Sequence, residues 1–247
     1  MSGNRFDFER IVPERRVERV RNQLHAAIYS GALRPGDPLR EVDLCRSLGV
    51  SQVTVREALA GLEHIDLITR TPHRRTEVKN LTREELDERI AIRVPLETLA
   101  CMLALENEWS ANDFDELAKK AEAINKDPLV DLAFHRYIWC RSGNSTLLRL
   151  LLQVSSCLFG FVSIMRAAEL QDPKQRVESH RKLIAALRVR EKSVIEKAVR
   201  DHLDSAYERF REQGYPDFKS LADRLNKPRL TNVDMSDLVK LVQQPSY

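Results

Sequence analysis

Residues 41–63 read EVDLCRSLGVSQVTVREALAGLE, and this stretch decides the fold of the amino-terminal part of the chain. Glu41 to Leu48 is predicted to form a short helix, which ends at Gly49. Ser51 can then cap a second helix that runs to about Glu63. A helix, a glycine-containing turn and a second helix in this order predict a helix-turn-helix.

The front of the second helix carries side chains that suit DNA reading. In a helix-turn-helix this helix enters the major groove and its first residues reach the base edges. Glutamine pairs with adenine, and arginine pairs with guanine or phosphate. We expect Gln52, Thr54 and Arg56 to face outward. The apolar residues expected to pack inward are Val53, Ala58, Leu59 and Leu62. The bare pattern also fits an ordinary pair of surface helices.

The segments on both sides complete a winged arrangement. Apolar residues at helical spacing predict a first helix over residues 14–30, preceded by a loose arm over 1–13. Residues 66–70 and 76–79 are short and β-prone, so they are predicted to pair as a hairpin. Its tip reads Pro72-His73-Arg74-Arg75.

The rest of the chain predicts one helix after another. Thr82 and Glu85 form a capping-box pattern for the first of them. Six helices are expected at about 83–107, 112–124, 128–142, 145–168, 174–190 and 193–212. The fold class is therefore mainly α, with a winged helix-turn-helix followed by an antiparallel all-helical bundle. The expected boundaries are an arm at 1–13, a DNA-binding domain at 14–80, an effector-binding domain at 81–213 and a tail at 214–247.

Composition and charge fit this plan. The 247 residues are 43% hydrophobic and 31% charged, which is typical of a globular protein with a real core. Residues 1–80 hold 14 Lys and Arg against 11 Asp and Glu, whereas residues 81–247 hold 26 of each, so the net charge of +3 lies in the first part. No signal peptide or membrane span is indicated, and the four widely spaced cysteines form no CxxC pair. We therefore expect a cytoplasmic protein with no membrane partner.

Four residues in the helical part suit a metal ion. Asp131 and His135 are four residues apart, so they share one face of a helix. His180 and His202 lie about ten residues before and after a predicted turn, which places them level with each other. This donor set suits zinc, nickel, manganese or iron. On spacing alone, surface or hydrogen-bonded histidines remain the alternative.

The amino-terminal part resembles the GntR family of bacterial regulators. The resemblance covers residues 14–79 and rests on the strings 33–39, 48–51 and 55–59, with Leu44, Leu62 and 67–68 in register. It implies a winged helix-turn-helix that binds a pseudo-palindromic operator in double-stranded DNA as a homodimer. Gln52 departs from the arginine usual in the family, and the basic wing tip departs from the usual glycine-rich one. The residues expected to contact DNA are Arg40, Ser51, Gln52, Thr54, Arg56, Arg74 and Arg75.

Residues 83–212 resemble the FCD ligand-binding domain of the FadR subfamily. The residues that carry this resemblance are 93–97, Asp131 with 134–135, 142–144, His180 and His202. The resemblance implies that the metal ligands are Asp131, His135, His180 and His202. It implies a divalent ion, zinc before nickel or manganese, and a small carboxylate or sugar-acid effector. Arg93 and Asn144 are its expected contacts, although Arg93 could instead pair with Glu97 on the surface and Asn144 could only cap the next helix.

The function expected from these features is a transcription regulator, a repressor by the family pattern, whose operator affinity depends on the effector. One alternative is a DNA-binding protein in which the metal is only a structural staple. Another is a metalloenzyme, because such a site could activate water. No glutamate lies beside a metal histidine in the manner of HExxH, so we expect no enzyme activity.

Overall fold

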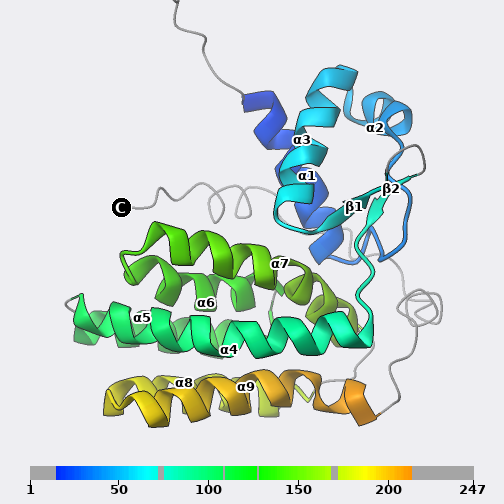
Figure 1. Cartoon of the computed structure of the whole chain (residues 1–247). Coiled ribbons are helices and arrows are strands. Elements are labelled where there is room, and N and C mark those ends of the chain that lie inside the picture. The colour runs from blue at the N-terminus through cyan, green and yellow to red at the C-terminus, as the bar shows by residue number, and fades with distance from the viewer. Residues whose placement is uncertain (1–14, 72–74, 108, 127, 168–171, 213–247) are drawn as a thin grey trace, which may run out of the picture.

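The structure is a computed structural model that describes residues 15–71, 75–107, 109–126, 128–167 and 172–212. Figure 1 shows two parts, which we call the head (α1 to α3 with β1 and β2) and the bundle (α4 to α9). The arm and tail expected from the sequence, and Arg74 of the wing tip, lie outside the described residues. The mainly α architecture agrees with the expected fold class.

Three helices form the head: α1 (Arg15–Tyr29), α2 (Glu41–Leu48) and α3 (Gln52–His64). Gly49 ends α2 with a φ of 64°, a left-handed conformation that glycine adopts without steric penalty. The Ser51 side chain accepts a hydrogen bond from the backbone N–H of Thr54 and caps α3, as the sequence predicts.

The inward face of α3 differs from the expected one at one position. Val53 was predicted to pack inward, but it is 63% exposed. The buried residues are Val55, Ala58, Leu59 and Leu62. These four share one face because they recur at helical spacing, and residue 53 falls on the opposite side of the helix.

The wing is a two-stranded sheet. Strands β1 (Ile68–Arg70) and β2 (Thr76–Val78) pair antiparallel, with Ile68 opposite Val78. The turn before α2 is tied to it, because the Leu39 N–H donates to the Thr76 carbonyl at 2.7 Å. The wing and the helix-turn-helix are therefore held together as one unit.

The bundle contains α4 (Arg83–Glu106), α5 (Ala111–Ala123), α6 (Pro128–Arg141), α7 (Ser145–Ala167), α8 (Pro173–Val189) and α9 (Lys192–Glu212). These bounds agree closely with the helices expected from the sequence, and the capping box of Thr82 and Glu85 is present. Helix α4 contacts α6, α7 and α9, so it runs through the middle of the bundle. Helices α8 and α9 lie side by side along α4 (Figure 1).

The head rests on the bundle through α1 and α7. The Tyr29 hydroxyl donates to the Ser156 carbonyl at 2.9 Å. A Cβ built on Gly160 lies 3.6 Å from Ile28 and 3.7 Å from the Tyr29 ring, which shows how closely the two helices approach. Arg89 of α4 pairs with Asp66 of the head. Within the described ranges, no helix has both the length and the apolar character that crossing a membrane requires.

Candidate metal centre and nucleic-acid interface

Three helices of the bundle bring four metal-binding side chains together. Their exposures are 6% for Asp131, 1% for His135, 1% for His180 and 6% for His202. We call these four residues the ligand cluster. Asp131 and His135 lie on α6, one turn apart, whereas α8 and α9 supply the other two. The chain reverses at Arg190, which places the rings of His180 and His202 4.5 Å apart.

The donor atoms of the ligand cluster point at one another. Asp131 Oδ1 lies 3.2 Å from His180 Nε2 and 3.5 Å from His135 Nε2. His135 Nε2 and His202 Nε2 are 3.2 Å apart. Zinc bonds of about 2.0–2.1 Å in a tetrahedron place neighbouring donor atoms about 3.3–3.4 Å apart. These three spacings bracket that value, and the three histidines lie close enough together to share one small divalent ion.

The outward nitrogens of the three rings are already engaged. His180 Nδ1 lies 2.8 Å from the Arg176 carbonyl oxygen, and because a carbonyl only accepts, this nitrogen carries a proton and donates. His135 Nδ1 lies 2.9 Å from Glu97 Oε1, and His202 Nδ1 lies 2.8 Å from Ser179 Oγ. Partners of this kind orient metal-bound histidines in proteins. When the outward nitrogens carry the protons, the Nε2 lone pairs face the centre of the cluster and its carboxylate, an arrangement that a cation stabilises.

The ionisation of the ligand cluster is uneven. Burial, and then the neighbouring charges of His180 and His135, lower the pKa of His202 well below its usual value. Burial also acts to lower the pKa of His135, but the negative charge of Glu97 outweighs it and the pKa is raised. The His202 ring therefore resists protonation, whereas the His135 ring favours it. Metal binding must displace any proton on His135, which makes affinity depend on pH.

Glu97 holds a second layer of contacts behind the ligand cluster. Its Oε1 accepts from Trp139 Nε1 at 2.9 Å and from Arg93 Nη2 at 3.2 Å, besides its contact with His135. Burial raises the pKa of Glu97, but the positive charge of Arg93 dominates and the pKa is lowered. From the sequence, Glu97 was expected only as a surface partner of Arg93. The ion pair exists, but both side chains are buried, at 2% and 3% exposure.

Arg93 is prepared for an anionic partner. Its guanidinium lies over the rings of Phe159 and Trp139, 4.9 and 5.8 Å from their centroids. Arg93 Nε and Glu97 Oε2 are both buried without a hydrogen-bond partner among the described residues. Buried polar atoms without a partner are rare in folded proteins, so a missing ligand or water is the expected explanation.

Asn144, the other residue expected to contact the effector, directly precedes α7. It is exposed, and its Oδ1 accepts from the Leu147 N–H at 3.0 Å. This is a helix cap, as the local sequence allowed. A groove that reaches one member of the ligand cluster lies between α8 and α9. It has a volume of about 720 Å³, and Ser179 and His202 are among its lining residues.

One carboxylate organises the front of the helix-turn-helix. Glu41 of α2 accepts from Gln52 Nε2 at 2.8 Å, from Arg56 Nη2 at 3.0 Å and from Arg70 Nη2 at 3.2 Å. These hydrogen bonds, led by that of Arg56, lower the pKa of Glu41. Nothing in the sequence analysis singled out Glu41. Gln52 and Arg56 are exposed, as expected, but the side chains of both donate hydrogen bonds to this carboxylate.

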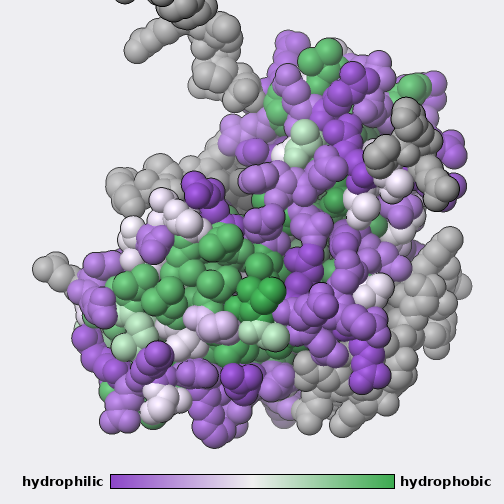
Figure 2. All heavy atoms as spheres, viewed as in Figure 1, coloured by the Kyte–Doolittle hydropathy of each residue, from purple (hydrophilic) through white to green (hydrophobic). Residues whose placement is uncertain are grey.

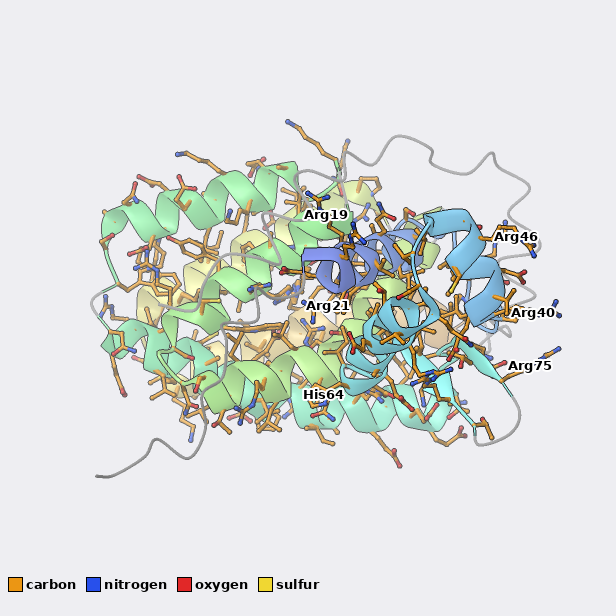
Figure 3. The ribbon with its side chains drawn as sticks, turned by 90° about the horizontal axis from the view of Figure 1, so that it is seen from above. Arg19, Arg21, Arg40, Arg46, His64 and Arg75 are labelled. Carbon is orange, nitrogen blue, oxygen red and sulfur yellow. The ribbon has the colours of Figure 1, made fainter. Side chains whose placement is uncertain are left out.

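The other residues expected to contact DNA surround this point. Ser51 and Thr54 are hydrogen-bonded to each other at the start of α3. Arg40 directly precedes α2 and Arg75 directly precedes β2, and both are exposed. Figure 3 shows Arg40, Arg46 and Arg75 extending from the head away from the bundle. The described basic residues thus frame one surface of the head.

Comparison with known proteins matches both parts of the chain. The family model described as bacterial regulatory proteins, gntR family, matches residues 16–78, and the FCD domain model matches residues 88–205. A protein of Paenarthrobacter nicotinovorans named "Probable D-xylose utilization operon transcriptional repressor" is 29% identical over 195 residues, which cover 76% of this chain and 85% of that protein. The HTH-type transcriptional regulator McbR of Escherichia coli K12 is 28% identical over 183 residues, covering 70% and 82%.

The fold is also found among solved structures. The structure of E. coli McbR/YncC covers 82% of this chain and 100% of its own, with a TM-score of 0.69 and 25% identity. Both named relatives are transcriptional regulators by name.

Proposed function

Because the chain belongs to the GntR family of bacterial regulatory proteins and carries an FCD domain, we propose that it is a repressor whose operator affinity is set by a small carboxylate. In this proposal the carboxylate binds at a divalent metal ion in the bundle. The chain is a transcriptional regulator and not an enzyme. The ligand cluster holds the ion, and Arg93 binds the carboxylate. Zinc suits the three imidazoles and one carboxylate best, with nickel and manganese as the other candidates.

The convergence of four buried donor atoms carries this proposal. The three histidines offer nitrogens within 4.8 Å of one another, and Asp131 Oδ1 lies 3.2 Å from His180 Nε2 and 3.5 Å from His135 Nε2, with the outward nitrogens of the rings occupied. When bound, the ion supplies positive charge and open coordination positions that accept carboxylate oxygens. Ordinary buried histidines satisfy themselves with neighbouring acceptors, and need no arrangement in which lone pairs meet.

Arg93 gives the effector its chemical class. Guanidinium binds carboxylate through two parallel hydrogen bonds, which supply orientation as well as energy. The Arg93 guanidinium lies over the Phe159 ring, and its Nε has no hydrogen-bond partner among the described residues and is available for such a contact. The name of one relative concerns D-xylose utilization, so sugar acids belong among the compounds to be tested.

The contact between α7 and α1 offers the route from bundle to head. The Phe159 ring lies 5.6 Å from the His135 ring, and the next residue, Gly160, lies against Ile28 and Tyr29 of α1. A shift of α7 that accompanies effector binding therefore moves the surface on which the head rests. An effector changes DNA affinity in this way only if it binds one arrangement more tightly than the other.

We also propose that the regulator acts as a homodimer, which reads a two-fold operator with two heads. Ile92 and Leu99 lie seven residues apart on α4 and are 52% and 46% exposed, and Leu150 of the neighbouring α7 is 43% exposed. Figure 2 shows apolar side chains gathered over this side of the bundle. A second copy that covers this face buries it. Sedimentation should give a dimer that Leu99→Glu dissociates, and a monomeric native protein would contradict the proposal.

The deciding experiment is a thermal-stability screen with small carboxylates and sugar acids, run with and without prior chelation of metal. A compound at 100 times its dissociation constant adds about 2.7 kcal/mol, which is easily detected. A stabilising compound whose effect disappears on chelation, and which releases the protein from its operator, is the expected result. If chelation alone lowers the melting temperature and no compound acts, the metal is a structural staple. If neither acts, the ligand cluster holds no metal.

A further inference from the structure

Two exposed valines stand at the front of the helix-turn-helix. Val42 is the second residue of α2 and Val53 the second residue of α3, and they are 62% and 63% exposed. The other large apolar side chains of high exposure among the described residues lie on the bundle. Single exposed apolar residues are common on proteins, so exposure alone carries little information. The position of these two is what matters.

Both valines border the contact that joins the starts of the two helices. Glu41 directly precedes Val42 and accepts from Gln52, which directly precedes Val53. Val53 points away from the core, because the buried face of α3 lies on the opposite side. The valines therefore flank the part of the head that enters the major groove in a helix-turn-helix.

The surroundings of the valines suit the same partner. Arg40 and Arg46 lie before and within α2, and Arg75 lies on the wing; all three extend from the head (Figure 3). The Arg46 side chain is 79% exposed, with only a long contact of 3.8 Å to Asp43. Exposed arginines around a reading helix contact phosphates and fix its position on the duplex.

The chemistry of the major groove then identifies what the valines touch. Beside Gln52 and Arg56, whose donors end on Glu41 in this structure, Val42 and Val53 present exposed apolar side chains on the same front. The thymine 5-methyl group is the apolar feature that base pairs display in the major groove. We infer that Val42 and Val53 contact thymine methyl groups, one each, in every half-site of the operator. This inference rests on DNA binding by the head and is independent of the effector.

Replacement of thymine by deoxyuridine tests the inference, because it removes the methyl group and nothing else. Selection from random duplexes with the full-length protein first identifies the half-site. Affinities are then measured at constant salt for duplexes in which each thymine is replaced in turn. Loss of one buried methyl contact should weaken binding about fourfold at two positions in each half-site. Val53→Ala should remove the effect at one of these positions, and Val42→Ala at the other.

Val189→Ala is the matched control, because it shortens a valine of 52% exposure on α8, in the bundle. Every deoxyuridine effect should persist in that variant. If the native protein tolerates deoxyuridine at all positions, or if the effects persist in both head variants, the valines do not read thymine, although DNA binding stands. If no sequence is enriched at all, DNA reading by the head is itself wrong, and the inference falls with it.

Discussion

The ligand cluster of the bundle and the front of the head are both built from polar side chains, but they differ in their access to water. Every member of the ligand cluster is at most 6% exposed, and the outward nitrogens of its rings are already paired. Gln52 and Arg56 of the head are exposed and share one carboxylate, Glu41. Polar side chains are therefore shielded from water in the ligand cluster and open to water and to DNA at the front of the head.

The difference teaches how to recognise a site that needs an absent partner. Inside the bundle an unpaired polar atom is strongly unfavourable, and the convergence of donor atoms there is the basis of the proposed cation site. On the head an ion pair in water contributes at most about 1 kcal/mol, so Arg56 can leave Glu41 for DNA at little loss. The geometry of a buried polar cluster can therefore indicate which ligand it binds. The geometry of an exposed cluster shows only which partners lie within its reach.

The largest effect is expected when the ligand cluster is dismantled. His180→Ala combined with His202→Ala removes two of four donors and should reduce bound metal from one ion per chain to none. Chelation should then no longer change the melting temperature. Elemental analysis and thermal unfolding measure both, with circular dichroism as the check of folding. The control is His25→Ala, which changes a buried histidine outside the cluster and should retain the ion. Stoichiometric metal in the double variant refutes the ligand assignment.

The second largest effect is expected for Glu97→Gln, because this change removes the buried negative charge that faces Arg93 and His135. Breaking a buried ion pair from one side typically costs about 3–5 kcal/mol. Loss of a partner behind a metal ligand typically weakens metal binding about 10–100-fold. Denaturant unfolding and competition with a chelating dye measure the two effects. Glu116→Gln, at an exposed pair with Lys119, should change neither. A Glu97 variant with native stability and metal affinity contradicts the role given to this carboxylate.

His25, a buried histidine outside the ligand cluster, should make the free energy of unfolding depend on pH. Burial, and then the charges of Arg21 and Arg136, lower its pKa from 6.5 to about 4. The unfolded chain therefore binds a proton before the folded one does, and the native state loses stability as the pH falls from 6.5 to 4. The loss amounts to about 3 kcal/mol. Denaturant unfolding at a series of pH values should show a steeper fall of the unfolding free energy with falling pH for the native protein than for His25→Gln. Equal slopes would show that His25 is not held neutral.

The smallest free-energy effect among these is expected on the head. Arg56→Ala should weaken operator binding by about 1–3 kcal/mol, because a lost arginine contact to a base has roughly that magnitude. The free energy of unfolding should change by less than about 1 kcal/mol, since the pair with Glu41 is exposed. Gel-shift titration and denaturant unfolding measure the two. Arg200→Ala on α9 is the control, with an exposed arginine paired to Glu196. Unaltered binding by Arg56→Ala would mean that this residue does not read the operator.

Much of the fold follows from local sequence. Helical periodicity, Gly49, Ser51 and the capping box of Thr82 predict where helices begin and end, because these signals act within a few residues. The pattern did not predict the phase of α3 correctly. Val53 and Val55 are both apolar, but Val55 is the one in helical register with Ala58, Leu59 and Leu62, and it is buried where α3 packs against α1.

The candidate site divides in the same way. Asp131 and His135 are neighbours by helical spacing alone, and the turn at Arg190 makes His180 and His202 level, so the sequence determined which residues could meet. The tertiary structure decided what surrounds them. It buries Glu97 beneath Trp139 and His135, leaves Asn144 as a cap, and joins Gln52 and Arg56 through Glu41. The physical reason is range: hydrogen bonds and periodicity within a helix are encoded locally, whereas burial and the pairing of charges depend on which helices pack together.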